Sequence, residues 1–141
     1  MILFCSALQI EVNKIIMINL IIDAANDKIL FKIITEDESY TNEHDNNREN
    51  FDKFAILLFN FIKEKNIKIE EVDNIFINHG PGKFSSIRIS ISTVKALCFS
   101  KGINFYGFNS NELKNLNYHN IIELFKKGSL KKNLIKPLYL S

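Results

Sequence analysis

The residues with the most evident chemical potential lie in one short segment, Gly80-Pro-Gly-Lys-Phe-Ser-Ser86. A glycine turn that follows a strand and precedes a helix is a place where backbone N–H groups gather around an anion. The segment is not a Walker loop, because Phe84 stands where that motif requires Ser or Thr after the lysine. A purely structural turn and an anion contact therefore both stay open as interpretations.

A second set of reactive side chains is acidic, and consists of Asp23, Asp27 and the carboxylates at 36–38. Carboxylates of this kind hold the metal ions of ribonuclease-H-like nucleases. All of them except Asp23 fall at expected turns, where a solvated charge is the usual meaning. A nuclease is therefore the weaker interpretation, and we expect no catalytic residue in the chain.

The histidines and cysteines lack metal-binding spacing. His44, His79 and His119 are too far apart in sequence to share one helical face, and Cys5 and Cys98 form no CxxC or Cys/His motif. We therefore expect no metal site and no disulfide framework, and a reducing cytoplasm is the expected location.

The composition is that of one folded domain that is not held in a membrane. Of 141 residues, 46% are hydrophobic and 24% are charged. A formal net charge of +2 is too small to drive binding to nucleic acid or membrane by bulk charge. No apolar run approaches the roughly 18 residues that a membrane helix needs. Any RNA contact must then be local, or provided by a partner.

Hydrophobic periodicity predicts an α/β unit that starts with antiparallel strands. The expected elements, in chain order, are strands at 17–23, 28–35 and 38–43, a helix at 48–65, a strand at 72–78, a helix at 86–100 and a strand at 103–108. A short helix at 121–127 and a basic linker at 128–136 should follow. This order resembles a ribonuclease-H-like lobe with a mixed sheet and two long helices.

Each long helix carries more apolar surface than one buried side requires. The arc of helix 48–65 exceeds half the circumference, whereas a surface helix needs a stripe of only about 100°. Helix 86–100 has a core stripe made of Ile87, Ile91, Val94 and Cys98. Its other side carries small residues that would permit the close approach of another helix.

The segment Asn78–Leu97, NHGPGKFSSIRISISTVKAL, resembles the pattern GPGSFTGLRIGLATAKGLA of the TsaB family, also called YeaZ. The stretch 17–25 is similar to the family's opening strand ILALDTAT, and Pro137-Leu-Tyr-Leu140 to its closing PxYLR. The resemblance covers about 17–110 and the last few residues. The family-type loop residues are Gly80, Pro81, Gly82, Phe84 and Arg88.

The resemblance implies an actin-like ATPase lobe and a role in tRNA threonylcarbamoyladenosine synthesis. The family member is a non-catalytic subunit that binds and stabilises the TsaD-type transferase through a helical bundle. It also implies a TsaE-type ATPase partner, tRNA reached through the complex, ATP bound only at a partner subunit, and a homodimer when the chain is alone. The expected partner contacts are Phe54, Leu58, Phe61, Ile89, Ser92, Thr93, Ala96 and Phe99.

The sequence also departs from the family. We expect an N-terminal extension or mis-assigned start at 1–16, a TsaB-like lobe at 17–110, and a short remnant of the second lobe with a tail at 111–141. Ala24 and Ala25 stand where the larger ATPase fold has phosphate-binding hydroxyls. A small nucleotide-binding or hydrolase enzyme of the same fold, or a homodimeric scaffold, are the alternatives.

Overall fold

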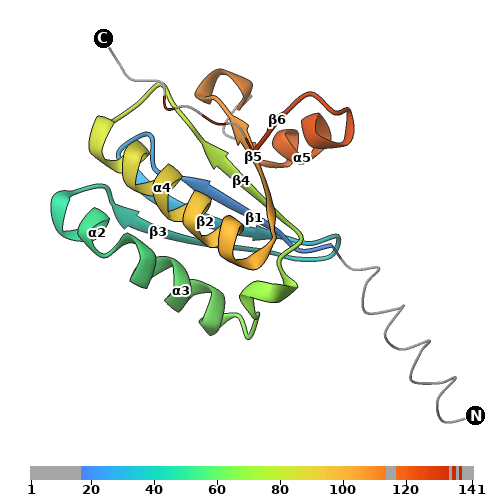
Figure 1. The fold of residues 1–141 in the computed structure, drawn as a ribbon, viewed down its shortest axis with the longest axis horizontal. Helices are drawn as coiled ribbons and strands as arrows, with labels where there is room; N and C mark the ends of the chain where they lie inside the picture. Colours follow the sequence, from blue (N-terminus) through green and yellow to red (C-terminus); the bar gives the residue numbers. More distant parts are fainter. Residues whose placement is uncertain (1–16, 114–116, 134, 136, 138–141) are drawn as a thin grey trace, which may run out of the picture.

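Six strands form one mixed sheet, in the order β3-β2-β1-β4-β5-β6 (Figure 1). The computed structural model describes residues 17–113, 117–133, 135 and 137. The strands are β1 Asn19–Asp23, β2 Lys28–Ile34, β3 Ser39–Asp45, β4 Asn74–Asn78, β5 Asn104–Phe108 and β6 Lys131–Lys132. β1, β4 and β5 are parallel, while β2, β3 and β6 pair antiparallel with their neighbours. The predicted mixed sheet with an antiparallel start is confirmed, and its third strand is longer than predicted.

The helices cover both faces of the sheet. They are α2 Arg48–Asp52, α3 Phe54–Glu64, α4 Phe84–Lys101 and α5 His119–Lys126, with short 3₁₀ turns at Ile69–Glu71 and Ser110–Glu112. α2, α3 and α4 pack on one face and α5 on the other (Figure 1). None of the helices in the described ranges is long and apolar enough to cross a membrane.

The single helix predicted at 48–65 is divided in two at Lys53, which corrects the prediction. The side chain of Asn47 accepts a hydrogen bond from the backbone N–H of Asn50 at 2.9 Å and caps α2. The N–H of Lys53 then bonds the carbonyl of Asn50 at 3.1 Å, three residues back. Such a tight turn ends the α-helical ladder. α3 starts directly afterwards, with Phe54 turned into the core.

Side chains alternate along the parallel strands, so each strand contributes to two cores, one on each face of the sheet. In β1, Leu20 and Ile22 point to the α3–α4 side, while Ile21 points to the α5 side. Phe76 of β4 lies in the second core with Ile121 of α5. All residues of β1 and β4 are buried. This explains why both strands read as continuous apolar runs rather than as alternating ones.

α4 has the two sides that its sequence predicts. Ile87, Ile91, Val94 and Cys98 are all buried against the sheet. The helix ends at Gly102, whose φ of 69° lies in the left-handed region and whose N–H bonds the carbonyl of Cys98 at 2.8 Å. Burial raises the pKa of the Cys98 thiol to about 12, so this cysteine is an inert part of the core.

The C-terminal part joins the sheet instead of trailing away from it. The segment predicted as a basic linker contains β6, which pairs with β5. Asn133 fixes this pairing, because its N–H donates to the carbonyl of Phe105 at 2.9 Å and its Oδ1 accepts from the Phe105 N–H at 3.1 Å. The predictions for 1–16 and for 138–140 of the closing motif lie outside the described residues.

Candidate functional site

The carboxyl ends of parallel strands are where ligands usually bind in open α/β sheets. Here that edge contains Asp23 at the end of β1 and Asn78 at the end of β4. Oδ2 of Asp23 accepts a hydrogen bond from the hydroxyl of Tyr118 at 2.7 Å, and Oδ1 accepts from Nδ2 of Asn78 at 3.1 Å. Oδ1 also accepts from the backbone N–H of Ala25 at 3.2 Å. Both oxygens of the carboxylate are therefore engaged by the protein itself.

Burial controls the ionisation of this cluster. Asp23 is 3% exposed, and desolvation raises its pKa above the usual value, while the hydrogen bonds from Tyr118, Ala25 and Asn78 oppose that rise. The pKa of Tyr118 is raised mainly by burial and also by the neighbouring carboxylate. Because Tyr118 directly precedes α5, its hydrogen bond to Asp23 anchors the start of this helix to the sheet.

The GPG loop is packed directly on the β1–β2 turn. A Cβ at Gly82 would lie 2.2 Å from the carbonyl oxygen of Ala25, so only glycine fits there. The N–H of Lys83 donates to the same carbonyl at 3.0 Å, and the N–H of Gly80 donates to Oδ1 of Asn78 at 2.8 Å. These contacts favour the structural turn over the anion contact, because the loop's polar groups bond the protein.

Asn46 also holds the β1–β2 turn in place, and the sequence analysis did not identify this residue. Its Nδ2 donates to the carbonyls of Ala24 at 2.9 Å and Asn26 at 2.6 Å, and to Oγ of Ser86 at 3.0 Å. The β1–β2 turn is thereby tied to the start of α4. Sequence alone does not show that Asn46 is buried, so these contacts had no signal in the sequence.

The other acidic residues do not join Asp23. Asp27 is in the β1–β2 turn with a side chain that is 96% exposed, paired with Lys83 at 3.5 Å. The carboxylates at 36–38 follow β2 and lie near the start of β1, about 13 Å along the strand from Asp23. In the described ranges, no group of three or more His, Cys, Asp or Glu is arranged to hold a metal ion.

The histidines are also separate from one another. His44 is on edge strand β3 against the ring of Phe31, His79 follows β4, and His119 is exposed at the start of α5. Burial lowers the pKa of His79, so the imidazole is neutral at pH 7. We assign no chemical role to any of them.

The outer side of the helix layer is open. On α4, Ser92 and Ala96 are exposed, and Phe99 is 93% exposed. On α3, Ile56 is 61% exposed and Phe59 is 44% exposed. We call these five side chains the outer helix face. Ile56, Phe59 and Phe99 are therefore three large apolar side chains left in water on two helices that contact each other.

Three of the predicted partner contacts are corrected by the structure. Phe54, Leu58 and Phe61 of α3 are at most 1% exposed and belong to the core. The prediction assigned the inward side of α3 to a partner, because periodicity gives the angle between side chains but not which side meets the sheet. Ile56 and Phe59 are the exposed large apolar residues of this helix.

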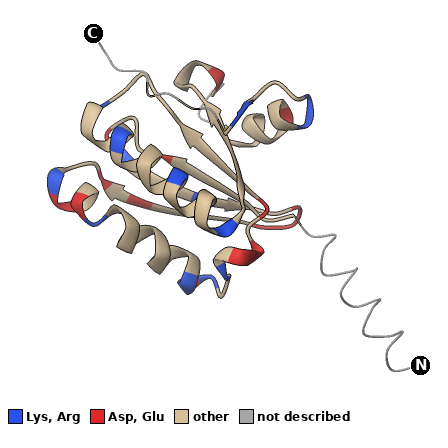
Figure 2. Ribbon diagram, in the orientation of Figure 1, with Lys and Arg blue, Asp and Glu red and all other residues tan. Residues whose placement is uncertain are grey.

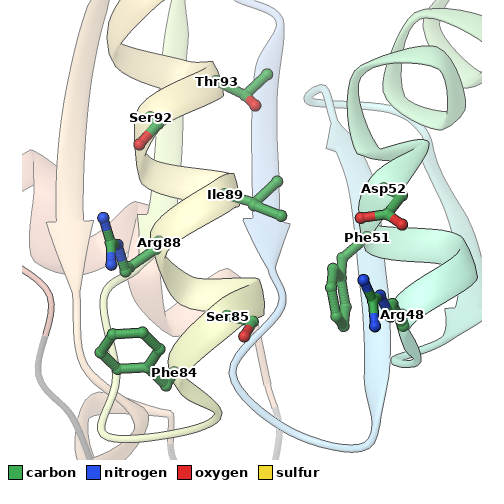
Figure 3. A pocket seen from close by; sticks show the side chains of 9 residues that line it. All are labelled: Arg48, Phe51, Asp52, Phe84, Ser85, Arg88, Ile89, Ser92 and Thr93. Carbon is green, nitrogen blue, oxygen red and sulfur yellow. The ribbon is translucent and has the colours of Figure 1, made fainter.

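A groove of about 640 Å³ separates α2 from α4 (Figure 3). Ile89 and Thr93 point from α4 toward Phe51 of α2, while Arg88 lies over the ring of Phe84, 5.3 Å from its centroid. The complete lining is Arg48, Phe51, Asp52, Phe84, Ser85, Arg88, Ile89, Ser92 and Thr93. Both arginines of the sequence therefore border one groove.

The family-type loop residues thus divide between two places. Gly80 and Gly82 are buried at the carboxyl ends of β1 and β4, which we call the closed sheet edge. Pro81 is half-buried between them. Phe84, which is 52% exposed, and Arg88 border the groove on the helix layer. Ile89, Ser92 and Thr93 line that groove, and Ala96 and Phe99 continue from it along α4.

This strand order, with its antiparallel start and its helix pair on one face, defines a ribonuclease-H-like lobe of the actin-like ATPase kind. Residues 44–119 match the family model TsaD, described as tRNA N6-adenosine threonylcarbamoyltransferase. Because these residues make up more than half of the chain, the chain belongs to this family. The TsaB-like recognition that began with the GPG segment is confirmed at the level of family and fold.

Solved structures agree on the fold. YeaZ from Pseudomonas aeruginosa superposes with a TM-score of 0.65 at 17% identity, covering 79% of this chain and 50% of that one. A protein described as uncharacterized, with similarity to peptidase YEAZ from Pseudomonas aeruginosa, gives 0.65 at 19% identity, covering 73% and 48%. The chain thus spans about half the length of these YeaZ structures.

RuvC of T. thermophilus, solved with a Holliday junction substrate, also shares the fold. Its TM-score is 0.55 at 8% identity, and the match covers 82% of this chain and 99% of that one. No curated protein matches the sequence.

Proposed function

We propose that this chain is a non-catalytic subunit that binds and stabilises a TsaD-type tRNA threonylcarbamoyltransferase through its outer helix face. The observation that carries this proposal is the exposure of Ile56, Phe59 and Phe99 on two neighbouring helices. Aromatic side chains are enriched at protein–protein interfaces relative to the rest of the surface. Ser92 and Ala96 lie one turn apart on α4 and would let a partner helix come close.

The state of the sheet edge supports the non-catalytic part of the proposal. A general base or metal ligand must reach a substrate, but the carboxylate of Asp23 is enclosed by Tyr118 and Asn78. The loop that would approach a phosphate is packed on Ala25. The residues at this edge therefore do not fit a nucleotide, and we expect the chain to hold no cofactor of its own.

The remaining partners follow from the same family. We propose that a TsaE-type ATPase joins the assembly, that tRNA reaches it through the complex, and that the outer helix face mediates a homodimer when the transferase is missing. A homodimeric scaffold without a transferase is the second candidate, and it would use the same exposed residues.

Co-expression with a TsaD-type transferase tests the proposal. The wild-type chain should co-purify with the transferase, and Phe99→Glu should lose it, since a charge at a buried apolar contact is costly. Met17→Glu is the matched control, because Met17 is also exposed, at 40%, but lies outside the helix layer. Loss in both variants, or in neither, would contradict the proposed surface. If the wild-type chain forms a homodimer and does not bind the transferase, the homodimeric scaffold is the better account.

A further inference from the structure

The two edge strands of the sheet carry opposite charge, with Glu43 and Asp45 on β3 and Lys131 and Lys132 on β6 (Figure 2). The acidic edge is the segment 36–45, which contains five carboxylates and no lysine or arginine: Glu36, Asp37, Glu38, Glu43 and Asp45. The opposite edge, at the end of α5 and on β6, carries Lys126, Lys127, Lys131 and Lys132. We call these four lysines the basic edge. Six strands at about 4.8 Å spacing separate the two edges by about 24 Å.

The basic edge is a fixed arrangement of four lysines, of which Lys127 lines one pocket with Glu112 and Glu123, and Lys126 lines another with Glu36. All four lysines are exposed, and the ion pairs found in the described residues involve Lys28, Lys53, Lys83 and Lys101 instead. A tight turn at Gly128, whose φ is 72°, joins the two lysine pairs. The N–H of Ser129 bonds the carbonyl of Leu124 at 2.9 Å and closes this turn.

Local structure accounts for part of this pattern. Lysines at a helix C-terminus interact favourably with the helix dipole, and lysines on an edge strand prevent pairing with another sheet. Either role is met by one or two lysines. Four lysines in seven residues exceed that need, and they outnumber the three carboxylates Glu36, Glu112 and Glu123 that share pockets with them.

We propose that the basic edge contacts the phosphate backbone of the RNA bound by the complex, an inference that rests on the proposed function. Lysine ammonium groups neutralise phosphates and release counterions without reading sequence. Glu43 and Asp45 on β3 repel phosphate at the far edge strand, so the RNA approaches from the β6 side. The outer helix face stays free for the protein partner, because α3 and α4 lie on one face of the sheet and α5 lies on the opposite face (Figure 1).

RNA fits this surface better than a lipid bilayer does. Interfacial membrane binding needs exposed apolar side chains beside the basic ones. Among the described residues, the exposed large apolar side chains are Met17, Ile56, Phe59, Phe84 and Phe99, and none belongs to the basic edge. A charged surface without such anchors is typical of backbone contacts to nucleic acid.

The test measures binding of an unmodified tRNA transcript to the full chain at several salt concentrations. Lys131→Glu with Lys132→Glu should weaken binding roughly tenfold near 0.1 M salt and lower the salt slope by about 1 to 2. Lys126→Gln with Lys127→Gln should act in the same direction. Lys63→Glu with Lys68→Glu makes the same charge change on exposed residues elsewhere and should leave binding near wild type.

Unchanged affinity and salt slope in both basic-edge variants would overturn the proposal, as would an equal loss in the Lys63/Lys68 control. Tighter binding of the wild type to phosphatidylserine vesicles or to a polyglutamate peptide than to tRNA would also overturn it. Co-purification with the transferase should be normal for the basic-edge variants. A failure there concerns the proposed function, whereas a failure of the RNA titration alone concerns the basic edge.

Discussion

The closed sheet edge and the open helix face differ in how their polar and apolar groups are satisfied. At the edge, Asp23, Asn78 and Asn46 bond to side chains and backbone of the same molecule. On the helix face, Phe99 and Ile56 are left in water. Ligands of this fold usually bind at the strand ends. Here the apolar surface that a partner could bury lies on the helices instead.

The boundary between the closed sheet edge and the open helix face lies within the segment Gly80–Ser86. Gly82 belongs to the closed edge and Phe84, two residues later, to the open face. One short segment therefore fixes the sheet edge and positions the first turn of α4. A sequence match to such a motif does not by itself identify a phosphate site.

The largest expected effect separates the two sides of α3. Phe61→Ala should reduce the free energy of unfolding by about 4 kcal/mol, because Phe61 is 1% exposed and packs on Phe31. Phe59→Ala, two positions earlier and 44% exposed, should change it by less than about 0.5 kcal/mol. Urea denaturation of both variants measures this. Similar losses would mean that α3 has no free side in the monomer.

The next effect concerns the closed edge. Gly82→Ala should cost about 3 kcal/mol, because a Cβ would overlap the backbone of Ala25. Gly102→Ala is the control: its φ of 69° is strained for alanine, but no atom lies within 4 Å, so about 1 kcal/mol is expected. Thermal denaturation compares the two. A Gly82 variant as stable as the Gly102 variant would show that the loop is not packed this tightly.

A smaller effect depends on pH. Because burial raises the folded-state pKa of Asp23 above its usual 3.8, the folded chain keeps this proton to higher pH than the unfolded chain. Wild-type stability from this group is therefore full below pH 3.8 and declines as pH rises through the folded pKa. Asp23→Asn lacks this titration. The stability of the variant relative to wild type should rise between pH 4 and 7 in denaturant titrations; a fall would mean a lowered pKa.

Sequence periodicity predicted the elements that have regular patterns and apolar surfaces. The predicted strands and the two faces of α4 are confirmed. β6 was missed because two lysines in a basic segment carry no strand pattern. The pairing depends on Asn133 reaching Phe105, 28 residues earlier, and such a contact is visible only in three dimensions.

The site was less predictable than the fold. Ile89, Ser92 and Thr93 line a groove with α2, but the choice of Phe54, Leu58 and Phe61 on α3 was wrong. A helix whose apolar arc exceeds half its circumference has two candidate core sides, and sequence does not choose between them. As interface residues, the α4 positions stay a prediction.

Binding of the Ala96→Trp variant to a TsaD-type transferase tests the central claim most directly. Ala96 is exposed on α4, away from the core stripe, so melting and circular dichroism of the free chain should match wild type. A bulky ring there would force partner helices apart and cost about 1 to 3 kcal/mol, which is a tenfold to hundredfold rise in Kd by titration calorimetry. An unchanged Kd for a folded variant would contradict binding through the outer helix face.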